Sequence, residues 1–183
     1  REGDIVLPED RYLSARHARF FRQDGQWYLR DLGSVNGVYR RLHKPVTLRH
    51  GDLVLLGLEV LQFELLDHAE RGLGHAIQHG VLVFGSPAAT RRARLVQRTV
   101  EGIFRDVYHL VQDETTIGRE TGDIVFTSDP FMSRRHAAIQ YSEASEDYVL
   151  VDLNSSNGTY LAIREDGRLE RTAGAFEPVR FAP

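Results

Sequence analysis

The sequence predicts an all-β protein made of two antiparallel β-sandwiches in tandem. Short runs rich in aromatic and branched residues follow one another closely along the chain, and such runs favour β-strands. Asp-Gly, Gly-Asp and Asn-Gly pairs, which are typical of tight turns, separate them. No long segment has the periodicity of an amphipathic helix, and one pattern of residues occurs twice.

The individual strands are assigned from these apolar runs and from the turn residues that flank them. In the first half of the chain they are expected at Ala18–Phe21, Gln26–Leu32, Leu53–Leu56 and Val60–Leu66. In the second half they are expected at Asp106–Val111, Thr115–Ile117, His136–Tyr141 and Asp147–Leu153.

Residues 67–93 interrupt this pattern with several glycines and a Ser-Pro pair, so we expect a connection between two domains. The predicted boundaries are 1–66 for the first domain, 67–93 for the linker and 94–183 for the second domain. Within the linker, Val81–Phe84 is too apolar to lie free in water. We expect this run to pack on one of the domains as an added strand.

The repeated pattern consists of three blocks in the same order. The second copy reads Gly118-Arg119-Glu120, then Ser133-Arg134-Arg135-His136, then Leu153-Asn154-Ser155-Ser156-Asn157-Gly158-Thr159. The first copy reads Arg1-Glu2, then Ser14-Ala15-Arg16-His17, then Leu32-Gly33-Ser34-Val35-Asn36-Gly37-Val38. The spacing between matching residues is nearly constant, so chance is a poor explanation.

These blocks resemble the motifs of the forkhead-associated (FHA) domain, a family of β-sandwiches that bind phosphothreonine in partner proteins. The resemblance covers roughly the first third and the second half of the chain, and it implies two FHA domains in tandem. It also implies a binding module that is not an enzyme and needs no cofactor.

Both ends depart from the family pattern. The first copy begins at the arginine that should follow a glycine, so its opening strands are missing from the chain. After Leu169, the second copy has no counterpart of the closing strands that follow Gly51-Asp52 in the first. Either the missing strands lie outside this chain, or two incomplete sandwiches complement each other. We favour the first explanation.

A phosphothreonine carries nearly two negative charges and three strong acceptor oxygens. Arg119 offers a guanidinium that can hold two phosphate oxygens, and Ser133 offers a compact hydroxyl donor. The resemblance implies further phosphate contacts from Arg134 and Ser156, and it implies that Asn157 holds the main chain of the ligand. A surface salt bridge of Arg119 with Glu120 or Asp123 is the alternative interpretation of that arginine.

Four other residues of the second copy are expected to brace the loops. Gly118 lets the loop turn tightly after a strand, and Gly158 permits the positive φ of an Asn-Gly turn. The resemblance assigns His136 to hydrogen bonds that brace the binding loop, and Thr159 to support of the Asn-Gly turn.

The first copy predicts a weak second site at Arg1, Ser14 and Asn36. Its Ala15, Val35 and Val38 replace residues that carry polar side chains in the second copy. Three lost polar groups, at roughly 0.5–1.5 kcal/mol each, weaken binding by about one to three orders of magnitude.

Other classes of function find little support. The chain has no cysteine, its formal net charge is −3, and no apolar run approaches the ~18 residues of a membrane span. We therefore expect a cytoplasmic protein that binds neither membrane nor nucleic acid. His68, His75 and His79 lie in the glycine-containing connection without a helical frame, so no metal site is predicted. No Gly-x-Ser-x-Gly motif surrounds Ser133, so no catalytic residue is predicted.

The predicted function is that of a phosphothreonine-dependent adaptor in Ser/Thr kinase signalling. Its second domain binds the ligand, and the partner is a phosphothreonine-containing protein, such as a Ser/Thr kinase or a kinase substrate. The alternative is a structural or protein-interaction scaffold that does not depend on phosphate.

Overall fold

The computed structural model describes residues 3–71, 77–79, 81–82, 91–99 and 104–163. The chain divides into two compact units, the first formed by Arg1–Arg41 and Tyr160–Pro183, and the second by Leu42–Thr159. These units cut across the predicted boundaries of 1–66, 67–93 and 94–183, which follow the sequence repeat and stay a prediction.

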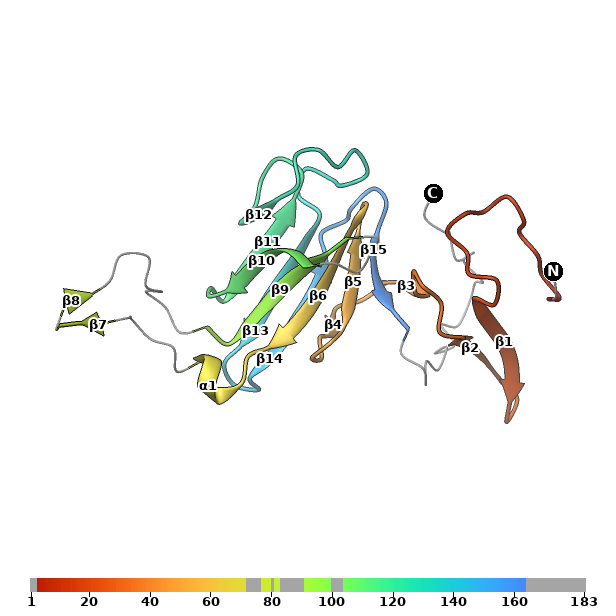
Figure 1. Cartoon of the computed structure of the whole chain (residues 1–183), viewed down its shortest axis with the longest axis horizontal. Coiled ribbons are helices and arrows are strands. Elements are labelled where there is room, and N and C mark those ends of the chain that lie inside the picture. Colours follow the sequence, from red (N-terminus) through yellow and green to blue (C-terminus); the bar gives the residue numbers. More distant parts are fainter. Residues whose placement is uncertain (1–2, 72–76, 80, 83–90, 100–103, 164–183) are drawn as a thin grey trace. The chain divides into compact units, whose positions relative to one another are not determined.

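The second unit is a sandwich of two sheets, and Figure 1 shows its two layers. One layer contains the antiparallel strands in the order β10 (Phe104–Leu110), β9 (Ala93–Arg98), β6 (Glu59–Leu65) and β5 (Leu53–Leu56). The other has the order β12 (Ile124–Val125), β11 (Glu114–Gly118), β13 (Ala137–Ser142), β14 (Asp147–Asp152) and β4 (Val46–Thr47). Among the described residues, the β11–β12 pair is the parallel one of this layer, and its other pairs are antiparallel.

Strands from the first sequence repeat complete both layers of this sandwich. In one layer β6 pairs with β9, with Phe63 opposite Leu95. In the other, β4 pairs with β14, with Val46 opposite Leu150. For the second repeat, complementation by strands of the first is therefore the arrangement that the structure shows, although the sequence favoured strands outside this chain. That the opening strands of the first repeat lie outside this chain stays a prediction. Edge pairing satisfies backbone groups that an incomplete sandwich would leave without partners.

The core of the second unit draws on both repeats. Its fully buried side chains include Leu56, Leu61 and Phe63 from the first repeat, and Leu95, Ile117 and Leu150 from the second. The ring of Phe63 lies 5.3 Å from that of Tyr148, at an interplanar angle of 56°. Buried residues alternate along β6, as expected for a strand with one face on the core.

The first unit contains a hairpin of β1 (Ala18–Gln23) and β2 (Gln26–Asp31). Asp24 and Gly25 connect them with φ values of 50° and 75°, the signs that a type I′ turn requires. The same unit pairs β3 (Tyr39–Arg41) with the last three residues of β15 (Thr159–Ala162).

The two repeats differ in how their corresponding hairpins are covered. Phe20 and Trp27 in the first repeat are 53% and 50% exposed. Their counterparts in the second repeat, Ile139 and Tyr148, are 2% and 4% exposed. Similar sequence therefore produces a core face in the second repeat and an exposed apolar face in the first.

The connection between the repeats contains the short helix α1 (His68–Arg71) and a two-stranded hairpin of β7 (Ile77–Gln78) and β8 (Val81–Leu82). Val81 pairs with Gln78 and is 68% exposed, so the expectation that this run adds a strand to a domain is wrong for Val81–Leu82. Val83 and Phe84 lie outside the described residues.

Most predicted strands are confirmed to within two residues of their ends. The sequence did not assign β3, β4, β7, β9, β12 or β15 as strands. Four of these have two or three residues and β15 has four, while β9 has arginines at Arg94 and Arg98 that obscured its apolar pattern.

If β6 completes the second repeat, replacing Phe63 by alanine destabilises the entire second unit. We expect Phe63→Ala to lower the free energy of unfolding by about 3–5 kcal/mol, the usual cost of truncating a buried aromatic residue. Urea unfolding followed by the near-ultraviolet signal of tyrosines measures this. The control is Phe20→Ala, whose side chain is half exposed. Equal and small effects of both substitutions contradict the proposed pairing of the repeats.

Candidate phosphopeptide site

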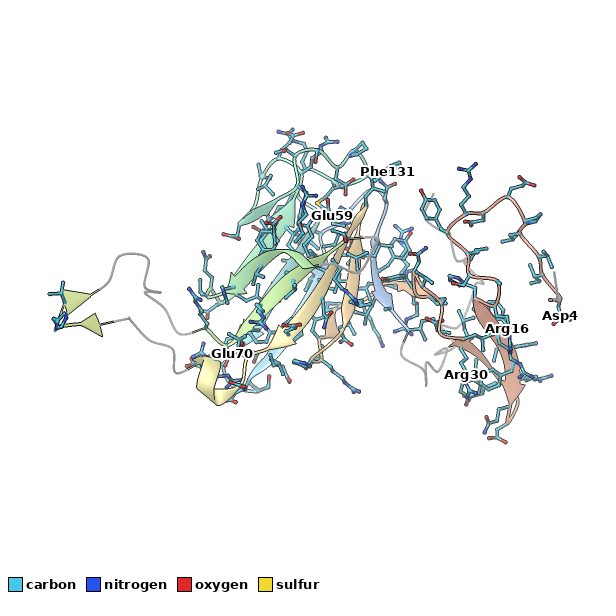
Figure 2. All side chains as sticks on the ribbon, viewed as in Figure 1. Asp4, Arg16, Arg30, Glu59, Glu70 and Phe131 are labelled. Carbon is cyan, nitrogen blue, oxygen red and sulfur yellow. The ribbon has the colours of Figure 1, made fainter. Side chains whose placement is uncertain are left out.

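The candidate site of the second repeat is formed by three loops at one end of the second unit. Figure 2 shows Phe131, from one of these loops, at the opposite end of this unit from Glu70 in α1. Backbone hydrogen bonds tie two of the loops together: Arg119 N–H donates to Ser133 O over 2.9 Å, and Thr121 N–H donates to Arg134 O over 3.2 Å. The third loop follows β14 and contains Ser156 and Asn157.

Two arginines in these loops share one carboxylate. An Nη atom of Arg119 lies 3.1 Å from Oε1 of Glu120, and Nε of Arg134 lies 2.8 Å from Oε2 of the same residue. The side chain of Arg119 is 34% exposed and that of Arg134 is 75% exposed. The two guanidinium groups thus converge on a single anion.

The structure contains the salt bridge that the alternative interpretation of Arg119 named, and it is formed with Glu120 rather than Asp123. Its carboxylate partner is Glu120, whereas Oδ2 of Asp123 accepts hydrogen bonds from the backbone N–H and the hydroxyl of Thr116, both at 2.8 Å. These bonds lower the pKa of Asp123. Asp123 is therefore hydrogen-bonded to Thr116 in β11, and Glu120 is the acid that the two arginines share.

Gly118 is required by close packing of the loops. A Cβ atom at this position would overlap with the carbonyl of Arg134 and lie 2.6 Å from the carbonyl of Thr121. The requirement is therefore the close approach of two backbone segments, and no side chain larger than hydrogen fits there.

Ser133 and Ser156 join the second loop to the third. The backbone N–H of Ser156 donates to Oγ of Ser133 over 2.9 Å, and the two hydroxyl oxygens are 3.5 Å apart. Asn157 adds another link, because its Nδ2 donates to the carbonyl of Phe131 over 2.7 Å. Hydrogen bonds thus hold three of the five predicted binding residues in neighbouring loops, and Glu120 joins the other two, which are the arginines.

His136 lies beneath these loops and is fully buried. Its Nδ1 accepts a hydrogen bond from Ser133 N–H over 3.0 Å, so the ring proton is on Nε2, which donates to Gly158 O over 3.0 Å. Burial lowers the pKa of His136, although the bond to Gly158 opposes the shift. The neutral ring therefore connects the second and third loops, which agrees with a bracing function.

Asp152 organises the third loop. Its Oδ1 accepts hydrogen bonds from the hydroxyls of Ser155 and Thr159, both at 2.6 Å, and its Oδ2 accepts one from Ser155 N–H at 3.1 Å. Burial opposes ionisation of this carboxyl, but the hydrogen bonds from Ser155 and Thr159 prevail and lower its pKa. Gly158, with φ of 88°, donates its N–H to Oγ of Ser155.

Sequence reasoning did not single out Asp152 and Ser155 as loop residues. A signal was present, because both repeats contain Asp-Leu-x-Ser before their Asn-Gly pair. Asp31 and Ser34 occupy these positions in the first repeat, and the N–H of Ser34 donates to Oδ1 of Asp31 over 2.8 Å.

The first repeat reproduces several of the loop hydrogen bonds of the second. Nδ1 of His17 accepts from Ser14 N–H at 3.1 Å, and its Nε2 lies 3.1 Å from Gly37 O. Oγ of Ser14 accepts from Val35 N–H at 3.0 Å. Nδ2 of Asn36 donates to Tyr12 O over 2.8 Å. The loop framework is therefore present in both repeats.

The repeats differ in the groups that can face a ligand. Arg1 lies outside the described residues. Val35 is 83% exposed and has no hydroxyl to offer, and Val38 is buried where Thr159 bonds Asp152 in the second repeat. The hydroxyl of Ser34 is buried without a hydrogen-bond partner among the described residues. The first repeat keeps the framework but has fewer donors.

Among the described residues, no helix is long and apolar enough to cross a membrane. The same part of the chain contains no cluster of three metal-binding side chains. His75 lies outside it, so the predicted absence of a histidine metal site stays a prediction.

Comparison with known proteins connects this geometry to one family. A family model described as the FHA domain matches residues 1–57 and 115–174, which together make up more than half of the chain. The two matches contain the motif blocks of the first and second repeat, respectively.

Several curated proteins are similar over shorter stretches. An oxoglutarate dehydrogenase inhibitor of Corynebacterium diphtheriae is 45% identical over 58 residues, which cover 31% of this chain and 40% of the relative. The FHA domain-containing protein FhaB of Mycobacterium tuberculosis is 47% identical over 46 residues, covering 25% and 29%. FhaB of Mycolicibacterium smegmatis is 44% identical over an equal length. The chain thus matches less than half the length of these relatives. No solved structure gives a significant match.

The buried state of His136 predicts a specific dependence of stability on pH. The unfolded chain takes up a proton on this histidine below about pH 6.5, whereas the native state, with its lowered pKa, does not. The free energy of unfolding should therefore fall by up to about 1.4 kcal/mol per pH unit as pH drops below that value. Asp123 and Asp152 also stabilise the native state, because their native pKa values are lowered from about 4. That stability is lost only in more acidic solution, as the pH falls through about 4 and below.

Urea unfolding between pH 7.5 and 5.5 tests this dependence. The pKa of His109 is lowered as well, so both histidines add to the slope of the free energy of unfolding against pH. The contribution of His136 is the part of that slope that disappears in His136→Asn. Nuclear magnetic resonance of the ring nitrogens should show His136 as the neutral Nε2–H tautomer at pH 6. A native His136 that titrates at or above pH 6.5 contradicts the bracing network.

Proposed function

Since the chain belongs to the FHA domain family, we propose that it is a phosphothreonine-dependent adaptor in Ser/Thr kinase signalling and that it binds its ligand mainly through the second repeat. It is a binding module rather than an enzyme. In this proposal Arg119, Ser133, Arg134, Ser156 and Asn157 contact the ligand, while Gly118, His136, Gly158 and Thr159 support the loops.

The convergence of Arg119 and Arg134 on Glu120 carries this proposal. Two guanidinium groups that already share a carboxylate have the position and the charge to share a phosphate instead. The phosphate of phosphothreonine has nearly two charges and a third oxygen. It therefore competes with a single carboxylate for the arginines, and charge-assisted hydrogen bonds make up most of its affinity.

Ser133 and Ser156 supply the remaining donors. Oγ of Ser133 accepts a hydrogen bond from Ser156 N–H over 2.9 Å, while its own proton is donated to Oγ of Ser156 over a long 3.5 Å, so that a stronger acceptor can replace this second bond. A phosphate oxygen near both serines can accept that proton. Because the backbone of this segment is held by His136, the donors are in position before the ligand arrives, which lowers the entropic cost of binding.

Ser133 is not arranged as a catalytic nucleophile. Nδ1 of His136 is bonded to the backbone N–H of Ser133, and the serine hydroxyl oxygen is bonded to Ser156. An activated serine requires its hydroxyl to donate to the histidine. This arrangement supports binding without a covalent step.

We propose that the first repeat binds phosphothreonine weakly, through Arg1, Ser14 and Asn36. Its framework of His17, Ser14 and Asn36 is intact, but it has Ala15 and Val35 where the second repeat has Arg134 and Ser156. Each lost polar contact costs about 0.5–1.5 kcal/mol, and more with a charged partner.

A scaffold that does not depend on phosphate is the second candidate, and one observation favours it for the first repeat. Strands β4, β5 and β6 of that repeat form part of the second unit, so the first repeat contributes structure whether or not it binds a ligand. The two candidates differ in whether dephosphorylation of the partner abolishes binding.

The partner in this proposal is a phosphothreonine-containing protein, such as a Ser/Thr kinase or a substrate of one. The name of one relative describes an inhibitor of an enzyme, which is an action on another protein. That name supports the general idea of regulation through protein binding.

The proposal predicts that Arg119→Ala strongly weakens phosphate-dependent binding. Loss of hydrogen bonds to a charged group, at about 1.5–3 kcal/mol, should weaken the affinity by roughly ten- to hundredfold or more. The measurement is a fluorescence titration of a degenerate phosphothreonine peptide library and its unphosphorylated twin. Arg135→Ala is the matched control, because Arg135 is exposed and its ion pair is with Glu114.

The wild-type chain should bind the phosphorylated library and ignore the twin, and Arg135→Ala should behave as wild type. Equal binding of both libraries, or an Arg119→Ala variant that binds normally, refutes the phosphate proposal and supports the scaffold.

A second prediction concerns Glu120. Glu120→Gln removes the charge that competes with phosphate for Arg119 and Arg134, so phosphopeptide affinity should rise. Exposed ion pairs contribute about 0.2–1 kcal/mol, which corresponds to an increase of up to about fivefold. The same titration measures it, with Glu114→Gln as control, since Glu114 pairs with Arg135. A fall in affinity would show instead that Glu120 is needed to orient the arginines.

A further inference from the structure

Asp129 is a buried acid that precedes the binding loop of the second repeat and lies 2% exposed. Its Oδ1 accepts a hydrogen bond from Phe131 N–H over 2.8 Å, and its Oδ2 accepts one from Leu58 N–H over 2.7 Å. Leu58 belongs to the turn between β5 and β6, which comes from the first repeat. One carboxylate therefore holds two backbone segments that are far apart in sequence.

The segment that Asp129 holds leads directly into the site. The carbonyl of Phe131 accepts the hydrogen bond from Asn157, and Ser133 follows two residues later. Displacement of Phe131 would move the acceptor of Asn157 and the start of the Ser133 loop together. The hydrogen bonds thus run from the β5–β6 turn through Asp129 and Phe131 to Asn157.

The β5–β6 turn is shaped for this contact. Gly57 has a φ of 58°, which disfavours other residues, and a Cβ atom at this position would overlap with the carboxylate of Asp129. The close approach of the turn backbone to the acid therefore depends on glycine. Leu58 N–H is presented to the acid because of this turn.

The first repeat contains half of this arrangement. Asp10 occupies the equivalent position, and its Oδ1 accepts a hydrogen bond from Tyr12 N–H over 2.8 Å, while Tyr12 O accepts from Asn36. The local loop motif is therefore common to both repeats. Asp129 differs from Asp10 in its second hydrogen bond, the one from Leu58 N–H of the β5–β6 turn. That bond depends on the tertiary structure and is not part of the repeated motif.

We propose that Asp129 is a positioning residue that makes the β5–β6 turn of the first repeat a part of the second repeat's ligand-binding site. The inference rests on the proposed function in that the site it positions is the phosphothreonine site. It gives the first repeat a specific structural role, because the amide of Leu58 fixes the carboxylate, which in turn fixes the loop from Phe131 to Ser133.

The test compares Asp129→Asn with Asp52→Asn. Asparagine has the shape of aspartate but only one oxygen, so it cannot accept from both Phe131 N–H and Leu58 N–H. Asp52 is the matched control: it is 6% exposed, its Oδ2 accepts from Arg49 N–H over 2.7 Å, and it lies at the other end of β5. Both substitutions remove one charge from a buried turn of the same unit.

Each variant is measured as the full chain for thermal stability, for amide resonances and for affinity toward the phosphothreonine library. Loss of a hydrogen bond to a charged acceptor should make Asp129→Asn bind about ten- to hundredfold more weakly. Its Ser133 and Ser156 amide signals and its Asn157 side-chain amide signals should shift. Asp52→Asn should keep its affinity and these signals, even if both variants lose similar thermal stability.

The proposal is overturned if Asp129→Asn leaves the site resonances unchanged, or if both variants lose affinity in proportion to their stability. The resonances need no ligand, so they test the positioning even if the wild-type chain binds no phosphopeptide, a result that would refute the proposed function alone. If Asp129→Asn does not fold, Gly57→Ala is the second variant. It disturbs the hydrogen bond between Leu58 N–H and Asp129 from the side of the turn, and it should shift the same amide signals.

Discussion

The antiparallel pairing of β6 with β9 is the contact on which the second unit depends. It joins a strand of the first repeat to a strand of the second and carries Phe63 into the core opposite Tyr148. Burial of this apolar surface stabilises the sandwich, and the ladder satisfies the backbone groups of two strands at once. Because β6 also pairs with β5, the turn between them lies next to Asp129, where Leu58 N–H donates to the carboxylate beside the candidate loops.

Above that core, the candidate binding loops are held by buried groups that are hydrogen-bonded within the protein. His136 is neutral and uses both ring nitrogens, and Asp152 gathers the hydroxyls of Ser155 and Thr159. The charged groups at the surface are arranged differently, because Arg119 and Arg134 meet at one partly exposed carboxylate. A rigid, hydrogen-bonded base beneath exchangeable surface charges suits reversible binding of an anion, since the ligand replaces an ion pair without rearranging the fold.

The two repeats show how far a local motif determines local structure. His17 and His136 make corresponding hydrogen bonds, as do Ser14 and Ser133, and as do Asn36 and Asn157. These contacts join the two loops that flank a single hairpin, so they form in both repeats although the hairpins are covered to very different degrees. Exposure of Phe20 and Trp27, compared with burial of Ile139 and Tyr148, arises from the strands that pack against each hairpin.

The sequence by itself determined the all-β class, most of the longer strands, the FHA resemblance and the residues of the candidate loops, because alternation, turn residues and short motifs are local signals. Even Asp152 was marked by an Asp-Leu-x-Ser pattern that both repeats share. Only the tertiary structure decided that β4, β5 and β6 complete the second repeat, that Glu120 joins two arginines, and that Asp129 binds the turn at Leu58. These contacts depend on which surfaces remain to be covered and on where side chains meet in space, and spacing along the chain carries no information about either.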